Sequence, residues 1–196
     1  MMPHFGKKSA LFGATAALAA APLLGGLLTA QAAPAAPDKA LLTCDMTGTA
    51  QFSPALSGNP FGAATTMKVE GEAIGCTPSG SWAEDVESAT FSGDLSGRMS
   101  CTSLPRDVGG DVDITWKFKD GSTETSKANF SLKLEGNPLR PSQGVSGAFV
   151  GETTDGEFAD AKHKGTGKFD MASAAGGCLA GGLSTLDFAG EYELSK

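Results

Sequence analysis

The sequence predicts an all-β protein of about eight antiparallel strands, arranged as an up-and-down barrel or a two-sheet sandwich, after an N-terminal signal helix. Apolar and polar residues alternate with a period of two along most of the chain, as in strands with one buried face. Turn residues separate the alternating segments, and none of these segments shows a sustained helical period with caps.

Residues 1–32 have the three parts of a secretory signal peptide. Lys7 and Lys8 supply the positive charge, Ala10 to Leu28 form the apolar core, and Ala30-Gln31-Ala32 is a small-x-small cleavage site. We therefore expect cleavage near Ala32 and a secreted, extracellular protein.

A retained membrane anchor is the alternative, because the apolar run has about the 20 residues that a membrane span needs. Against it, Pro22 and Gly25-Gly26 interrupt the run, and no basic stop-transfer cluster follows. Cleavage would leave no stable membrane span. Residues 33–42 are rich in Ala and Pro and predict a flexible lead-in to a single β domain at 43–196.

The alternation is clearest from Ser88 to Cys101, where Phe91, Leu95 and Met99 share one face and serine, threonine and charged residues the other. A helix would not gather these apolar residues into one stripe. In chain order, the other predicted strands are 44–52, 67–73, 112–118, 128–134, 145–149, 162–169 and 186–194. Asp120-Gly121 predicts a hairpin turn, and Gly-Asn-Pro sequences follow two other strands.

Four cysteines lie beyond the signal segment, and their wide spacing in an exported chain favours two disulfides over a zinc site. Three connectivities are possible. In a simple meander, the start of the first strand and the end of the second lie at one end of the molecule. This slightly favours Cys44–Cys76 together with Cys101–Cys178.

Removing residues 1–32 would leave 13 basic and 22 acidic residues, a net charge of −9. Such a surface repels phosphate backbones, so we expect no nucleic-acid partner; the partner is an unknown extracellular ligand or surface. We find no G-x-S-x-G, P-loop or H-E-x-x-H motif, and predict no catalytic residue, cofactor or metal site.

Two residues are possible ligand contacts. His163 shares a strand face with Gly165, Gly167 and Phe169, so it is either a polar group inside a barrel or a hydrogen-bonded core histidine. Trp82 follows Gly80-Ser81 in a predicted loop, where it could stack on a ligand or cap the core. Inward-facing glycines indicate either a cavity lined by bare backbone or simple barrel curvature.

Short phrases across most of the chain, all around its cysteines and aromatic residues, resemble small exported, β-rich, four-cysteine proteins of actinomycete bacteria: Cys44 with Gly48-Thr49, Gly75-Cys76-Thr77, Phe91-Ser92-Gly93, Ser100-Cys101, Ile114-Thr115-Trp116, and Cys178-Leu179 before Phe188. The resemblance implies export from a bacterial cell and a β-rich fold, but no activity. Separately, Gly156 to Ala161 is similar to a strand phrase of allene-oxide-cyclase and dirigent-like barrels, which bind apolar ligands inside.

These observations lead to two functional hypotheses. The first is a non-enzymatic binding or cell-surface-associated module, because catalytic residue types are scarce. The second is a small barrel enzyme of isomerase or lyase type with an apolar interior ligand, in which His163 works with a carboxylate. His163 beside Asp or Glu in a closed apolar cavity would favour the enzyme, and His163 facing solvent would exclude it.

Overall fold

The structure is a computed structural model that describes residues 40–79, 81–102, 106–136, 145–170, 177–178 and 180–196. Residues 1–39 lie outside this part, so the signal peptide and its cleavage near Ala32 stay predictions. Among the described residues, no helix has the length and apolar character to cross a membrane.

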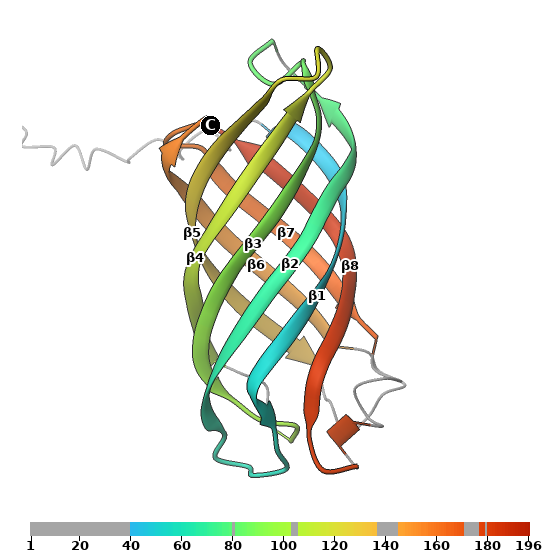
Figure 1. Cartoon of the computed structure of the whole chain (residues 1–196), viewed down its shortest axis with the longest axis vertical. Helices are drawn as coiled ribbons and strands as arrows, with labels where there is room; N and C mark the ends of the chain where they lie inside the picture. The colour runs from blue at the N-terminus through green and yellow to red at the C-terminus, as the bar shows by residue number, and fades with distance from the viewer. Residues whose placement is uncertain (1–39, 80, 103–105, 137–144, 171–176, 179) are drawn as a thin grey trace, which may run out of the picture. The chain divides into compact units, whose positions relative to one another are not determined.

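Eight antiparallel strands form a closed barrel in simple up-and-down order (Figure 1). Each strand pairs with the next along the chain, and the last pairs with the first. The all-β prediction is confirmed, and the alternative of a two-sheet sandwich is excluded. Within the residues that the structure describes, closure leaves no strand with an unpaired edge. The strands are β1 (Ala40–Leu56), β2 (Ala63–Pro78), β3 (Val86–Met99), β4 (Arg106–Phe118), β5 (Thr123–Gly136), β6 (Val145–Gly156), β7 (Lys162–Phe169) and β8 (Leu183–Ser195).

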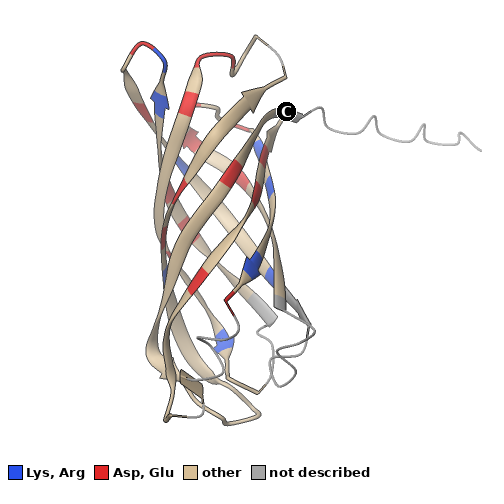
Figure 2. Cartoon of the chain, turned by 90° about the vertical axis from the view of Figure 1, so that its right-hand side faces the viewer, with Lys and Arg blue, Asp and Glu red and all other residues tan. Residues whose placement is uncertain are grey.

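The predicted alternation sorts side chains between the interior and the solvent. In β4, Val112, Ile114 and Trp116 are buried, whereas Asp113 and Thr115 between them are exposed. Figure 2 shows Lys, Arg, Asp and Glu at intervals along the strands of the barrel, and no Lys, Arg, Asp or Glu is among the buried residues of the part that the structure describes. Most of the large apolar side chains of the described residues therefore face the barrel lumen, with Phe61, Ile74 and Val150 as exposed exceptions.

Some strand boundaries differ from those predicted. β1 begins at Ala40, so residues 40–42 of the predicted lead-in belong to the strand, and residues 33–39 lie outside the described residues. β6 continues to Gly156, beyond the predicted end at residue 149, because the inward Thr153 hides the alternation. Gly156 to Ala161, which resembles a strand phrase of other barrels, contains only the last residue of β6 and then the turn that leads to β7.

The two disulfides are Cys44–Cys76 and Cys101–Cys178, the pairing favoured by the meander. Cys44–Cys76 joins the neighbouring strands β1 and β2. Cys101–Cys178 joins the β3–β4 connection to the connection that precedes β8. The second bridge therefore links segments that no strand ladder holds together.

An aromatic cluster closes the end of the barrel that carries the β2–β3, β4–β5 and β6–β7 turns, which we call the closed end. Phe158, in the β6–β7 turn, is buried although its backbone has a φ of 57°, a conformation that is costly for a bulky residue. Its ring lies edge-on to Trp82 at 4.8 Å and to Trp116 at 5.0 Å. The ring packing offsets the backbone strain and fixes the turn across the barrel.

Candidate functional site

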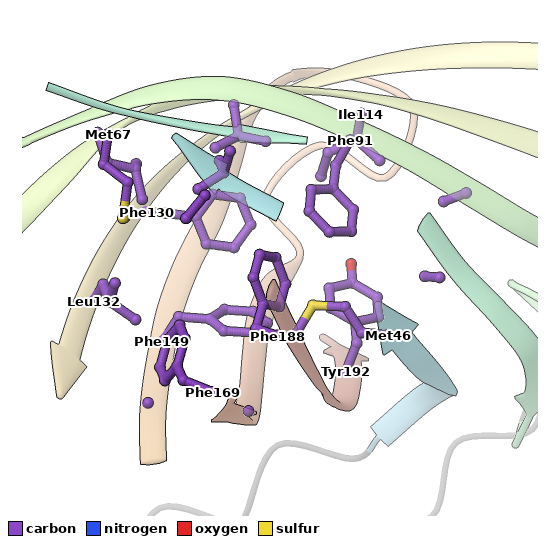
Figure 3. Close-up of a pocket in the computed structure, with 18 of the residues that line it drawn as sticks. Met46, Met67, Phe91, Ile114, Phe130, Leu132, Phe149, Phe169, Phe188 and Tyr192 are labelled. Carbon is purple, nitrogen blue, oxygen red and sulfur yellow. The ribbon is translucent and has the colours of Figure 1, made fainter. Parts of the chain in front are cut away.

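The candidate site is an apolar cavity of about 100 Å³ inside the barrel (Figure 3). Only apolar surface faces it, and its lining comes from the inner faces of all eight strands. Two methionines, Met46 and Met67, line it from β1 and β2. Its aromatic lining residues are Phe91, Trp116, Phe130, Phe149, Phe169, Phe188 and Tyr192.

Inward-facing glycines make room for aromatic rings on neighbouring strands. An atom of the Phe188 ring lies only 2.6 Å from the position that a Cβ on Gly48 would take, which is too close for any side chain there. Phe149 covers Gly165 in the same way, and Phe130 covers Gly151 at 2.7 Å. These three glycines therefore do not expose bare backbone to a cavity, because a ring of a neighbouring strand covers each of them.

Gly167 differs from these glycines. A Cβ on Gly167 would meet only the carbonyl oxygen of Ala189, at an ordinary contact distance of 3.6 Å. Gly167 pairs with Gly147 across the β6–β7 ladder, and both line the cavity. Bare backbone therefore faces empty space at this position, as the cavity hypothesis for the glycines requires.

His163 is buried, with 2% of its surface exposed, but it is not part of the cavity lining. Its Nε2 lies 2.7 Å from Thr153 Oγ1, and its Nδ1 lies 2.7 Å from the hydroxyl of Tyr192. A neutral imidazole has one donor and one acceptor nitrogen, so these two hydrogen bonds engage both nitrogens of His163. Burial lowers the pKa of His163 to about 4 and raises that of Tyr192 well above its usual value.

The second polar group beside the cavity is also engaged within the protein. The indole Nε1 of Trp116 donates a hydrogen bond of 2.8 Å to Ser126 Oγ, which in turn donates to the carbonyl oxygen of Glu157. Among the described residues, no buried side-chain polar atom lacks a partner. The polar groups near the cavity therefore hold the barrel together, and the cavity wall itself offers only carbon and sulfur.

The enzyme hypothesis required a carboxylate beside His163, and the described residues that bond to it are a threonine and a tyrosine instead. Trp82 lies at the closed end with 37% of its surface exposed. Its ring packs on Phe158, and Lys196 Nζ lies 4.6 Å from its centroid. Trp82 thus caps the core and does not reach the lumen.

Sequence reasoning missed Tyr192 and Thr153. Tyr192 is the only tyrosine of the chain and lies on an apolar strand face, where a buried phenol needs a hydrogen-bond partner. That signal points to a polar partner inside the barrel, and His163 is the only histidine beyond the signal segment. The pairing itself depends on the register between β7 and β8 and on side-chain directions.

The chain matches no protein-family model, no curated protein and no solved structure closely enough to show a relationship. The fold and the cavity therefore define it as an eight-stranded up-and-down barrel with an apolar lumen. Membership in the actinomycete group stays a prediction from the sequence.

Proposed function

We propose that this protein is a secreted, non-enzymatic binding module that holds a small apolar molecule in the barrel lumen. The observation that carries the proposal is the cavity of about 100 Å³ with its wholly apolar wall. Binding sites for small molecules are concave, mostly apolar and largely pre-formed. Burial of apolar surface supplies the favourable free energy, and the rigid barrel lowers the entropic cost of binding.

Secretion is part of the proposal. Two disulfides form and persist in an oxidising compartment, which supports a location outside the cytosol. The signal-peptide pattern of residues 1–32 agrees with this location. The charged outer wall suits a free extracellular barrel or one attached to a surface partner (Figure 2).

The isomerase or lyase hypothesis has one observation in its favour, namely that Tyr192 lines the cavity and bonds to His163. A tyrosine–histidine pair can transfer protons. However, the Tyr192 hydroxyl and both nitrogens of His163 are engaged with one another and with Thr153. We therefore prefer the binding function.

Xenon uptake tests the binding proposal, because xenon enters dry apolar cavities. We expect the wild-type protein to bind xenon and Gly167→Leu to lose this binding, because the leucine side chain adds four carbon atoms where the cavity is empty. The measurement is the ¹²⁹Xe chemical shift during a protein titration. Thr166→Val is the matched control, since Thr166 is the neighbouring, outward-facing residue of β7. Equal shifts for wild type and Gly167→Leu would contradict binding in the lumen.

Mass spectrometry of the exported protein tests the location. We expect a mature chain that begins near residue 33 and carries both disulfides, so that reduction adds the mass of four hydrogens. Native mass spectra recorded before and after extraction with organic solvent show whether the protein carries a bound apolar molecule, because the extraction would remove its mass. A full-length chain retained in the membrane fraction would show that the apolar segment acts as an anchor.

A further inference from the structure

Phe61 is the most exposed large apolar residue of the part that the structure describes, with 83% of its surface exposed. It lies in the β1–β2 connection, at the end of the barrel opposite to the closed end, which is the lower end in Figure 1 and which we call the Phe61 end. A single apolar residue on a surface is common and needs no function. Two further observations set Phe61 apart, because its loop is held in one conformation and the end around it is almost uncharged.

Hydrogen bonds hold the backbone on both sides of Phe61. Its amide nitrogen donates to Asn59 Oδ1 at 3.0 Å. Arg98 Nη2, on β3, donates to the carbonyl oxygens of Phe61 and Gly62, at 3.3 Å and 2.9 Å. Gly62 has a φ of 65°, which favours glycine, and its Cα lies close against the backbone of Met99. The loop therefore presents the Phe61 ring in a fixed position, which lowers the entropic cost of binding through it.

The β1–β2 connection is also tied to two other connections at the Phe61 end. The amide nitrogen of Cys101 donates to the carbonyl oxygen of Ser57 at 2.9 Å, and Thr102 Oγ1 donates to that of Gly58 at 3.3 Å. The Cys101–Cys178 disulfide continues this link to the connection that precedes β8. The loop of Phe61 is thus part of one cross-linked rim.

Charged residues are scarce in the connections at the Phe61 end. The four connections there contain only two charged residues, Arg140 and Asp170, whereas the three shorter ones at the closed end contain six. The former are residues 57–62, 100–105, 137–144 and 170–182, and the latter are residues 79–85, 119–122 and 157–161. In Figure 2 the described loops at the bottom of the barrel are mostly tan, and those at the top carry red and blue. Few charges therefore lose water when the Phe61 end enters an apolar medium.

We propose that the Phe61 end docks on a phospholipid bilayer, with the Phe61 ring among the lipid chains and Arg98 beside a headgroup phosphate. Arg98 is exposed, and the guanidinium N–H groups that do not hold the loop can donate to phosphate oxygens. A stable protein–protein interface buries about 800 Å² on each partner, which is far more than one projecting ring supplies. A ring on an uncharged rim suits a fluid lipid interface instead.

The net charge of the protein selects the kind of bilayer. After cleavage the chain carries a net charge of −9, so an anionic membrane repels it and a zwitterionic one does not. The charged closed end then points away from the lipid. Docking goes beyond the proposed binding function, but the two are compatible. The cavity lining reaches Phe169, the last residue of β7 at the Phe61 end, so a docked barrel holds its lumen near the membrane.

Co-flotation of the mature protein with phosphatidylcholine vesicles tests the docking. We expect wild type to float and Phe61→Ser to need about tenfold more lipid for half-maximal binding, because the variant loses the burial of a phenylalanine side chain. Ile74→Ser is the matched control and should bind like wild type, since Ile74 is exposed and apolar but lies on β2 near the closed end. Addition of phosphatidylglycerol should weaken the binding of wild type. Failure of wild type to float, or an equal loss in both variants, would overturn the docking.

A second measurement needs no variant. When wild type is bound to bicelles that carry a nitroxide on the lipid chains, the amide NMR signals of Phe61 and Gly62 should broaden most and that of Trp82, at the closed end, least. Broadening centred on another part of the barrel would overturn the proposal. So would a dimer that depends on Phe61 and forms without vesicle binding, because it would assign the Phe61 end to a second copy of the chain. Xenon uptake reports on the lumen alone, so failure of the docking and failure of the proposed function are distinguishable.

Discussion

Replacing both Cys101 and Cys178 by alanine should lower the free energy of unfolding by about 4 kcal/mol. The two cysteines are 77 residues apart in the sequence, and closing a loop of this size restricts the unfolded chain strongly. In the folded protein, the bridge joins two connections that no ladder holds together. Urea unfolding of the mature protein, without added reductant so that the Cys44–Cys76 disulfide stays intact, measures the loss of free energy of unfolding. We expect the strand topology of the barrel to stay unchanged.

Cys44→Ala with Cys76→Ala is the matched control for this effect. Its cysteines are only 32 residues apart, so the constraint on the unfolded chain is smaller. They also join β1 and β2, which the ladder already pairs. A loss for the Cys101–Cys178 variant that is clearly smaller than the loss for this control would contradict the entropic explanation.

The faces of the strands could be predicted from the sequence because alternation is a local property. Burying Val112, Ile114 and Trp116 forces the residues between them outward, whatever the partner strands are. Closure could not be predicted in the same way, because it depends on pairing between β1 and β8, which lie at opposite ends of the domain's sequence. A barrel and a sandwich present the same alternation.

The cavity could be anticipated only in part. The inward glycines are visible in the sequence, but whether a glycine is covered depends on the register between strands. Gly165 lies beneath the ring of Phe149, whereas Gly167, two residues later, faces empty space. The aromatic closure of the barrel was also hidden, because Phe158 reaches it through a turn with a positive φ that its sequence does not indicate.

Acid should destabilise the protein through His163 by about 3 kcal/mol between pH 6.5 and pH 4. Burial lowers the pKa of His163 to about 4 in the folded protein, whereas the unfolded chain takes up the proton near pH 6.5. Between these values the unfolded state binds more protons, so the stabilisation is complete above pH 6.5 and is lost as the pH falls through 4.

His163→Gln separates this effect from the titration of carboxylates, because glutamine can bond to Thr153 or Tyr192 but takes up no proton. The free energy of unfolding, measured from pH 7 to pH 4, should fall more steeply in wild type than in the variant. His163 is the only histidine of the chain beyond residue 4, so its imidazole signal in NMR spectra is unambiguous once the signal peptide is removed. A titration midpoint near pH 6.5, or equal slopes for the two proteins, would mean that the imidazole is solvated and that the buried chain from Thr153 to Tyr192 does not form.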